Sequence, residues 1–339
     1  MAFKYILLPF SLIYYVVMSL RNLCYDRNIF RIHSLGVKVI SVGNITWGGT
    51  GKTPAILYLA KRLCSQGHRV AILTRGYGED EERLFSKLIP EVPVIVDKDR
   101  VRAGKTAIER YPIDTILLDD GFQYRRLKRD MDMVCIDATS PFGNNYIIPA
   151  GPLREGLGSL KRADIFLITK ADLVKDQKGL QALENKLKGI NCSALNAGAI
   201  HEFQYFYRLS DEQLVDIEFL KNKGKEIVLF SGIGNPVSFE KTVSGLGLKV
   251  NKHFIFRDHH RYKDSDFKKI NDYCGKNRID TMVTTEKDAV KLKAVSCQPS
   301  TTCPAPLWCG ISLLVMNIKL KITDNEQAFH NRLSGVYNS

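Results

Sequence analysis

A glycine-rich segment constrains the fold of this 339-residue chain more than any other feature. It reads VKVISVGNITWGGTGKTP over residues 37–54. Its apolar start predicts a strand, and Pro54 predicts the first turn of a helix, where the missing N–H of proline costs nothing. The glycines between them let the backbone turn tightly and point N–H groups at an anion. We therefore predict a phosphate-binding loop (P-loop) rather than a glycine-rich β-turn that happens to end in Lys-Thr.

Each polar residue of this loop has an expected role. Lys52 would place a point charge near the β- and γ-phosphates, and the Thr53 hydroxyl would be a magnesium ligand. Thr46 stands where the usual pattern has its first glycine. The predicted nucleotide-binding residues are Thr46, Gly48, Gly49, Thr50, Gly51, Lys52 and Thr53.

The residues after the loop predict a doubly wound, mostly parallel α/β sheet. Apolar residues at helical spacing cover residues 55–66, and residues 69–74 form a short, continuously apolar run typical of a strand covered on both faces. Strand, helix and strand in this order form a crossover unit. The second strand leads to RGYG at residues 75–78 and then to the acidic run at 79–82. Because ligands gather at the carboxyl ends of such strands, we expect this acidic run close to the mouth of the P-loop.

A second acidic signal follows the buried run at residues 115–118. Asp119 and Asp120 come directly after it, in the sequence LLDDGFQ. Carboxylates at a strand end can hold Mg²⁺ beside substrate phosphates, so one of the pair is a candidate metal ligand. The alternative is a hairpin turn at Asp120 and Gly121.

Further strands are predicted over residues 131–137 and 164–170. The segment 169–172, TKAD, resembles the base-reading motif of GTPases and indicates a strand end that faces the nucleotide, without deciding between adenine and guanine. From residue 224 the alternation of strands and helices restarts without a second phosphate loop. We therefore expect an N-terminal helix (1–30), a P-loop core (31–223) and a smaller α/β domain (224–339).

The N-terminal segment 5–20 is almost wholly apolar and is followed by Arg21, Arg27 and Arg31. It is shorter than the ~20 residues that a spanning helix needs. No small-residue cleavage site follows it, which argues against a secretory signal. Tyr14, Tyr15 and the trailing arginines favour a helix that lies in the membrane interface. A single membrane span and a buried core helix remain the alternatives.

The net charge and the cysteines indicate which kind of partner and which compartment to expect. Lys and Arg number 49 against 36 Asp and Glu, which gives a net charge of +13 and predicts an anionic partner such as a membrane surface or a phosphorylated substrate. No DNA- or RNA-binding motif is present. Eight cysteines are scattered, and Cys297, Cys303 and Cys309 match no zinc spacing, so we expect reduced cysteines in a protein that faces the cytosol.

The motifs together resemble the tetraacyldisaccharide 4′-kinases, which phosphorylate the lipid A precursor at the bacterial inner membrane. The resemblance covers nearly the whole chain and rests on VGNITWGGTGKTP, RGYG, LLDDGFQ, RD, PAGPLRE, GIGNP, DHH and TTEKDAVK. The family also lacks glycine at the position of Thr46. It differs after RGYG, where members have a longer segment that leads to Gly-Asp-Glu-Pro. Asp80 and Glu81 align with that acidic pair.

The resemblance implies a reaction and a set of roles. The enzyme would transfer the γ-phosphate of ATP, with Mg²⁺, to the 4′-hydroxyl of a tetraacyldisaccharide 1-phosphate held in the membrane. Asp80 would be the base, paired with His259 across a cleft between domains, although His260 could be the functional histidine. The expected catalytic residues are Asp80, His259, Lys52 and Asp120; the metal ligands are Thr53, Asp119 and Glu81; the substrate-binding residues are Arg75, Tyr77, Arg100, Gln123 and Arg154.

We expect a monomer at the cytoplasmic face of the inner membrane, held peripherally or by its one helix. The competing function is a membrane-bound P-loop switch of the partitioning or cofactor-delivery type, which hydrolyses ATP or GTP without modifying a lipid. That function would explain residues 37–120 and the apolar helix. It would leave the DHH and TTEKDAVK segments without a role.

Overall fold

The computed structural model of this chain describes residues 2–76, 79–174, 176–222, 224, 226–296 and 310–338. Tyr77 and the cysteines at 297, 303 and 309, which carry predictions above, lie outside these ranges. The chain forms two compact units. The first contains residues 1–76, 85–201 and 320–339, and the second contains residues 77–84 and 202–319.

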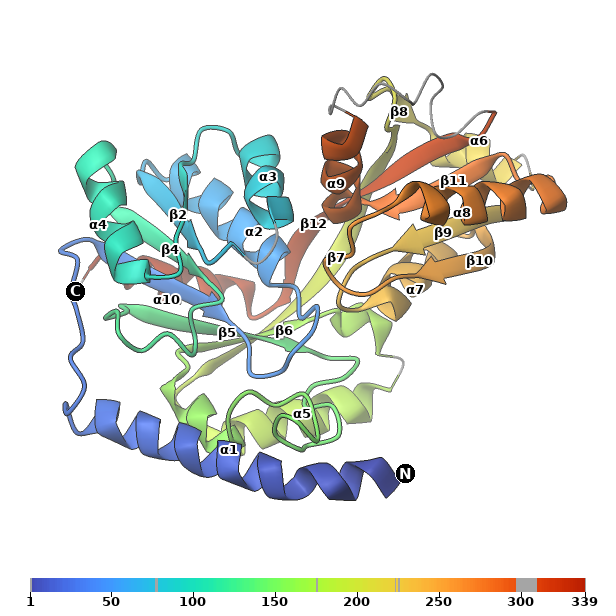
Figure 1. Cartoon of the computed structure of the whole chain (residues 1–339). Helices are drawn as coiled ribbons and strands as arrows, with labels where there is room; N and C mark the ends of the chain where they lie inside the picture. The colour runs from blue at the N-terminus through green and yellow to red at the C-terminus, as the bar shows by residue number, and fades with distance from the viewer. Residues whose placement is uncertain are drawn as a thin grey trace. The chain divides into compact units, whose positions relative to one another are not determined.

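The first unit is built on a parallel sheet with the strand order β7-β6-β5-β1-β4-β2-β3 (Figure 1). The central strands are apolar and buried along their whole length, as expected where helices cover both faces. The strands are β1 (Lys38–Gly43), β2 (Val70–Thr74), β3 (Val94–Val96), β4 (Thr115–Asp119), β5 (Met131–Asp137), β6 (Ile165–Thr169) and β7 (Leu195–Arg208).

Alternate side chains of these strands explain the two helical layers. On β1, Ile40 and Val42 pack in the same cluster as the apolar face of α2, whereas Val39 packs in the cluster of α4. The doubly wound fold predicted from the sequence is therefore confirmed. The unit's remaining elements are α2 (Lys52–Ser65), α4 (Arg100–Arg110), α5 (Gln177–Ile190), α10 (Glu326–Ser334) and the 3₁₀ turns η1 (Leu157–Arg162) and η2 (Ala171–Leu173).

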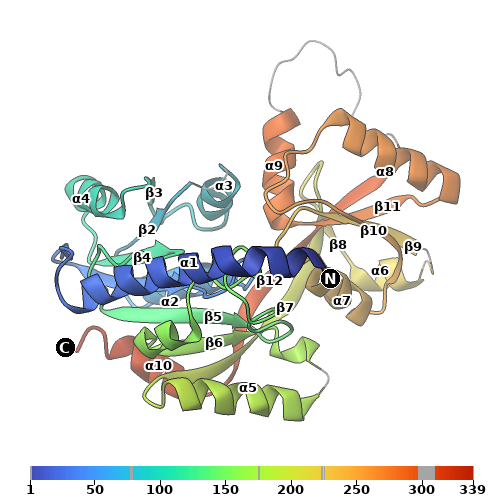
Figure 2. The same cartoon turned by 60° about the horizontal axis from the view of Figure 1, so that its bottom comes forward.

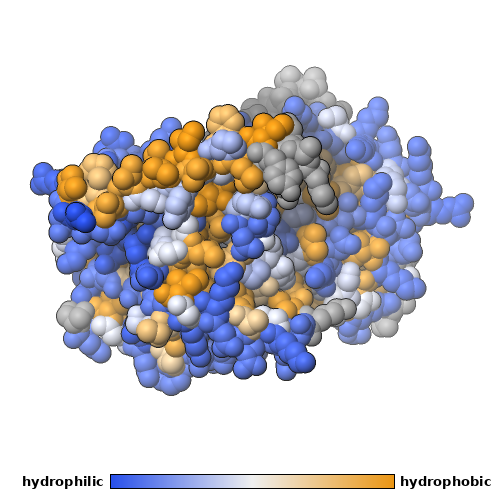
Figure 3. All heavy atoms as spheres, turned by 90° about the horizontal axis from the view of Figure 1, so that it is seen from below, coloured by the Kyte–Doolittle hydropathy of each residue, from blue (hydrophilic) through white to orange (hydrophobic). Residues whose placement is uncertain are grey.

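Helix α1 (Ala2–Asp26) lies on the outer side of the first unit (Figures 1 and 2). It lies within the predicted helix 1–30, and its segment Ile6–Asp26 is long and apolar enough to cross a membrane by length and composition alone. Only 6% of its most apolar window is buried, so the core-helix alternative is wrong. A band of apolar side chains runs along α1 on the face seen in Figure 3. Its exposed members include Ile6, Phe10, Leu12, Ile13, Val16, Val17 and Leu20.

The second unit is a smaller α/β structure with the strand order β10-β9-β11-β12. Val228 and Phe230 of β9 pack in the cluster of α8, and Leu229 packs in the cluster of α7, so helices again cover both faces. Its elements are α6 (Ile217–Asn222), α7 (Pro236–Gly245), α8 (Asp264–Asn277), α9 (Glu286–Ser296), β8 (Leu214–Val215), β9 (Glu226–Ser231), β10 (Lys249–Ile255), β11 (Thr281–Thr285) and β12 (Ser312–Asp324).

Helix α3 (Glu79–Leu88) differs from expectation, because the acidic run read as a loop is the first turn of a helix. Acidic residues suit the positive end of a helix dipole, and Leu84 and Phe85 on the following turn are buried. Residues 79–84 cluster with the second unit and the rest of α3 with the first. The compact units therefore have other bounds than the predicted domains 31–223 and 224–339, which remain a prediction.

Candidate active site

The P-loop lies between β1 and α2 in the first unit and has the geometry of an anion-binding turn. Gly48 and Gly51 adopt φ angles of 121° and 86°, which favour glycine. Gly51 is the N-cap of α2 and supplies no side-chain acceptor, and the first turn of α2 contains no acidic residue. The N–H groups at this helix end are therefore without a side-chain cap, which suits a phosphate.

Asp120 is the centre of a charged cluster beside this helix end. Its φ of 53° turns the chain sharply after β4. One carboxylate oxygen lies 3.4 Å from Lys52 Nζ, and Arg154 Nη1 donates to both oxygens at 2.8 and 2.7 Å. Gln123 Oε1 accepts a further bond from the same Arg154 nitrogen at 3.3 Å. Four residues predicted to act in the site are thus brought together by direct contacts.

The electrostatics of Asp120 follow from these neighbours. Burial alone would raise the pKa of its carboxyl group, but the charges of Lys52 and Arg154 and their hydrogen bonds lower that pKa to about 2. Asp120 is therefore ionised throughout the neutral range. Its neighbour Asp119 is also buried and accepts a hydrogen bond from the Thr74 hydroxyl at 3.1 Å.

The other predicted substrate-binding residues have different surroundings. Arg100 is only 3% exposed and donates to the backbone carbonyls of Asp97 and Asp119 at 3.3 Å each, so its guanidinium is engaged with the protein. Burial lowers the pKa of Arg100. Arg75 is exposed just after β2, and Tyr77 lies outside the described residues. The roles assigned to these three residues remain predictions.

The donor set fits a nucleotide phosphate with a magnesium ion. The uncapped end of α2 and Lys52 are suited to an anion, while Asp119 and Asp120 offer oxygens to a hard cation. In the part of the chain that the structure describes, no cluster of three or more His, Cys, Asp or Glu could hold a metal by itself. Magnesium does not need one, because it keeps waters and substrate phosphates in its shell.

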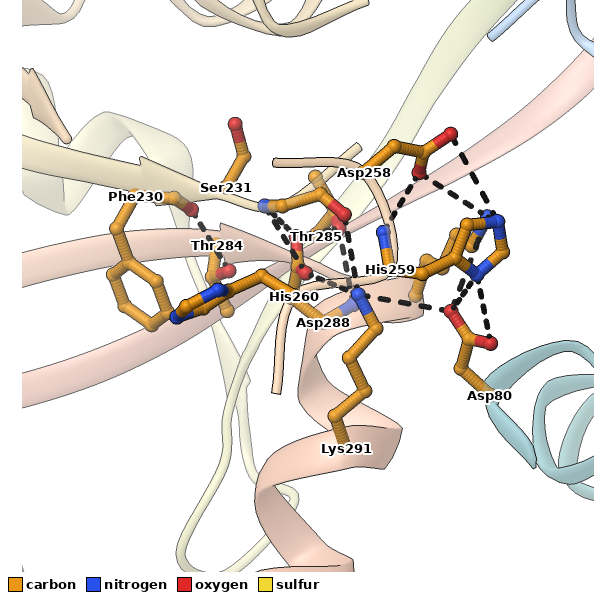
Figure 4. Close-up of polar contacts among 12 residues, drawn as sticks. Asp80, Phe230, Ser231, Asp258, His259, His260, Thr284, Thr285, Asp288 and Lys291 are labelled. Carbon is orange, nitrogen blue, oxygen red and sulfur yellow. Dashed lines mark hydrogen bonds and ion pairs between the residues drawn. The ribbon is translucent and has the colours of Figure 1, made fainter. Parts of the chain in front are cut away.

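A second charged cluster, in the second unit, is centred on Asp80 and His259 (Figure 4). His259 Nδ1 lies 3.0 Å from both carboxylate oxygens of Asp80. Asp80 is in the first turn of α3, and His259 follows β10 with a left-handed φ of 58°. The sequence placed them in different domains, but residues 77–84 belong to the same compact unit as His259.

Two lysines of α9 flank this pair. Lys291 Nζ lies 3.6 Å from Asp80, and Lys287 Nζ lies 3.9 Å from Asp80 and 3.4 Å from Glu81. Burial alone would raise the pKa of Asp80, but the hydrogen bond from His259 and the lysine charges lower it. The same hydrogen bond raises the pKa of His259, against the opposing effects of burial and Lys287.

Asp288 connects Lys291 to the backbone after β9. Its side chain is fully buried and accepts from Gly232 N at 3.1 and 3.2 Å, from the Thr285 hydroxyl at 2.8 Å and from Lys291 at 3.0 Å (Figure 4). Lys291 also donates to the Gly232 carbonyl at 3.1 Å. Sequence reasoning missed both lysines. In the sequence, the available signal was that these two lysines are four residues apart, which places them on one face of a helix that also carries Asp288.

The other histidine of the DHH segment has structural contacts. His260 Nε2 lies 2.8 Å from the Asp266 carboxylate, and its ring stacks on Phe256 at 4.7 Å between centroids. These contacts anchor His260 at the start of α8. Glu81, the third predicted metal ligand, is paired with Lys287 instead of with a second carboxylate.

Comparison with known proteins identifies the family. The family model described as tetraacyldisaccharide-1-P 4′-kinase matches residues 3–338. The chain belongs to this family. The tetraacyldisaccharide 4′-kinase of Syntrophus aciditrophicus is 38% identical over 319 residues, which cover 86% of this chain and 84% of that protein. The enzyme of the same name from Halothermothrix orenii is 38% identical, with 82% and 80% covered.

A solved structure agrees with the sequence comparisons. The crystal structure of LpxK from Aquifex aeolicus in complex with ATP is 27% identical to this chain, with a TM-score of 0.72 and coverage of 98% of this chain and 99% of that one. The predicted family, the P-loop α/β fold and the assignment to the lipid kinases of lipid A biosynthesis are confirmed. The apolar helix α1 fits a membrane-associated bacterial protein.

Proposed function

We propose that this chain transfers the γ-phosphate of ATP to the 4′-hydroxyl of a tetraacyldisaccharide 1-phosphate. The observation that carries the proposal is the contact of Lys52 and Arg154 with Asp120 at the uncapped end of α2. In this arrangement the α2 end and Lys52 bind the phosphates, and Asp120 fixes the lysine ammonium. Arg154 neutralises charge on the transferring group or binds the 1-phosphate of the lipid.

Magnesium is part of the proposal. The Thr53 hydroxyl, Asp119 and Asp120 would hold it, and the bound ion would screen the negative charge of the phosphates. Lys287 forms an ion pair with the Glu81 carboxylate. We therefore place Glu81 with the charged cluster around Asp80 and not among the proposed magnesium ligands.

The second unit supplies the proton acceptor. A sugar hydroxyl is a weak nucleophile, so its proton has to be accepted as the new bond forms. Asp80 stays ionised because the pKa of its carboxyl group is lowered, and the hydrogen bond between the two side chains raises the pKa of His259. In the proposed pair, Asp80 is the base, and His259 orients its carboxylate through Nδ1 and shares the proton as transfer proceeds.

Helix α1 supports docking in the interface rather than spanning. Ser11 donates to the Ile147 carbonyl at 2.8 Å, and near the other end Arg125 donates to Asp26 at 2.6 Å. These two contacts are fifteen residues apart, or about 22 Å of helix. A helix held against the first unit over this length presents one apolar face, and that face suits the cytoplasmic surface of the inner membrane.

The decisive experiment follows the label of γ-labelled ATP. Purified protein is incubated with ATP, magnesium and tetraacyldisaccharide 1-phosphate in mixed micelles, and with micelles that lack the disaccharide. We expect label in the lipid only in the first sample. Label that appears only in inorganic phosphate in both samples would favour the P-loop switch instead.

The docking proposal has its own test. Leu12 and Val17 are 63% and 55% exposed on α1, and replacing both by Asp should weaken binding to anionic phospholipid vesicles by roughly tenfold or more. Leu214→Asp, on β8 and 70% exposed, is the matched control for adding an acid at an exposed apolar position. Unchanged vesicle binding of the α1 variant would mean that the basic surface suffices without the helix.

A further inference from the structure

Lys170 has three unusual properties at once. It lies just after β6, and only 2% of it is exposed, although lysine is almost never buried without a partner. Its φ and ψ of 57° and 34° are left-handed, a strained conformation for a residue with a side chain. Burial lowers the pKa of its ammonium group, against the raising effect of Asp137. Such strain persists only where the surrounding contacts impose it.

The contacts of Lys170 explain the strain. Its ammonium forms an ion pair with the buried carboxylate of Asp137 and donates to the backbone carbonyl of Gly49 at 2.6 Å. Asp137 is otherwise engaged with Thr139, whose N–H and hydroxyl donate to it at 2.9 and 2.6 Å. The lysine therefore links a fully satisfied carboxylate at the end of β5 to the middle of the P-loop.

Two neighbours of Lys170 support the adjoining loop residues. The Thr169 hydroxyl donates to the carbonyl of Thr50 at 2.9 Å. A Cβ added to Gly51 would come within 3.1 Å of His201 Nε2 and of Thr169 Cγ2, so these side chains lie directly against the loop. Gly49 and Thr50 are thus held by hydrogen bonds from the end of β6, and Gly51 lies against His201 of β7.

We propose that Lys170 is a positioning residue for the donor nucleotide and does not read its base. A carbonyl oxygen that faced the phosphates would repel them. Lys170 and Thr169 hold the carbonyls of Gly49 and Thr50 on the β6 side, and in a trans peptide the next N–H points to the opposite side. The N–H of Gly51 is thereby directed away from β6. The loop is therefore already arranged to bind an anion.

This inference deepens the proposed function, because it assigns a role within the same nucleotide site. It also gives the TKAD segment a different role from the one that its GTPase resemblance suggests. The lysine side chain is directed into the protein and onto the loop. Loss of Lys170 should therefore weaken the binding of every nucleoside diphosphate by the same factor.

The test uses the full chain and two variants. Lys170→Met removes the contact with Gly49 but leaves Asp137 unpaired, which could destabilise the fold. Asp137→Asn/Lys170→Met removes both charges, so folding and loop positioning are separated. Lys161→Met, at an exposed position of η1, is the matched control. The binding of ADP and of GDP, each with magnesium, is measured by calorimetry, and melting temperatures report folding.

We expect the double variant to bind ADP roughly tenfold more weakly, as for the loss of a hydrogen bond to a charged group, with the ratio of ADP to GDP affinity unchanged. The KM for ATP should rise and that for the lipid should stay the same. A double variant that melts like the wild type and binds ADP normally would overturn the proposal. So would a changed ADP to GDP ratio, which would indicate base reading. Because ADP binding needs no lipid, failure of the lipid kinase proposal would leave this result interpretable.

Discussion

Asp120 in the first unit and Asp80 in the second are both carboxylates held between cations, yet their partners differ. Asp120 contacts Lys52 and Arg154, and these two cations, against the effect of burial, lower its pKa to about 2. The nearest partner of Asp80 is His259, a side chain that can take up or release a proton, and their hydrogen bond raises the pKa of the imidazole. The first carboxylate is thus a fixed charge, whereas the second belongs to a pair that can exchange a proton.

The two centres also differ in how the chain assembles them. Asp120 directly follows a buried strand and is fixed by a local turn. Asp80 depends on three segments that are remote in sequence, which are α3, the turn after β10 and α9. Substitutions at the first centre should therefore alter the fixed charge of the site, whereas substitutions at the second should alter proton transfer.

The largest effect is expected from breaking the proton-sharing pair. Asp80→Ala and His259→Ala should each lower kcat by roughly 10²–10⁴-fold, because general base catalysis is lost. The double variant should be little worse than either single variant, since residues that act as a unit are not additive. Steady-state kinetics with the lipid substrate would measure all three losses.

His260→Ala is the control for this cycle, because His260 is bonded to Asp266 and not to Asp80. Its kcat should stay within a few-fold of the wild type. Fully multiplicative losses in the double variant, or an inactive His260→Ala beside a near-normal His259→Ala, would reject the pairing.

The fixed-charge centre is tested by Lys52→Ala. This change removes the ammonium beside the uncapped end of α2 and leaves Asp120 with Arg154 alone. We expect turnover to fall by roughly 10²–10³-fold, the size of a lost electrostatic contact to a transferring group. Lys61→Ala, an exposed lysine on the same helix, should behave as the wild type. A wild-type kcat for Lys52→Ala would refute the assigned role.

A smaller effect is expected from the lysines that lower the pKa of Asp80. Lys291→Met removes an ammonium 3.6 Å from the Asp80 carboxylate, so the pKa of Asp80 should rise toward its ordinary value. The acidic limb of the kcat profile should move to higher pH, with about a tenfold loss of kcat. Lys268→Met, exposed on α8, is the control. An unmoved pH profile would show that Lys291 acts only through the contacts of Asp288.

The smallest effect concerns stability. His259 has a raised pKa, so its stabilising contribution is complete below its unfolded pKa of about 6.5 and is lost as the pH rises through the folded value. Asp80 has a lowered pKa, so its contribution is lost as the pH falls through the folded value. The melting-temperature gain of the wild type over His259→Asn should be greatest near pH 5–6 and shrink on both sides. A gain that grows steadily with pH contradicts this sign.

The sequence predicted the first centre better than the second for a physical reason. The P-loop, β4 and the acidic pair are local patterns, in which strand, turn and helix signals adjoin one another. The predicted strands of the kinase core therefore lie within one or two residues of their expected bounds, but β7 was not predicted. Periodicity cannot show that Lys287 and Lys291 flank Asp80, because that contact depends on how α9 packs.

Two errors have equally specific causes. The run at 79–82 was read as a shortened loop from its alignment with the family's acidic motif, although Leu84 and Phe85 continue a helical pattern. The apolar run that ends at Leu20 was expected to be too short to span a membrane, but Tyr25 is buried and the segment Ile6–Asp26 is long enough. Polar residues such as Arg21 and Asn22 stay helical there because they bond to Gln123 and Glu155.

With α1 in the interface, as proposed, the enzyme meets its substrate by diffusion in two dimensions. The bonds from Arg21 to the Gln123 carbonyl and from Asn22 to Glu155 fix the tilt of the first unit against the membrane plane. The fold then sets the distance between the P-loop and the lipid headgroups. Turnover would follow the surface density of the lipid disaccharide, so dilution with inert lipid would slow the enzyme even at constant bulk concentration.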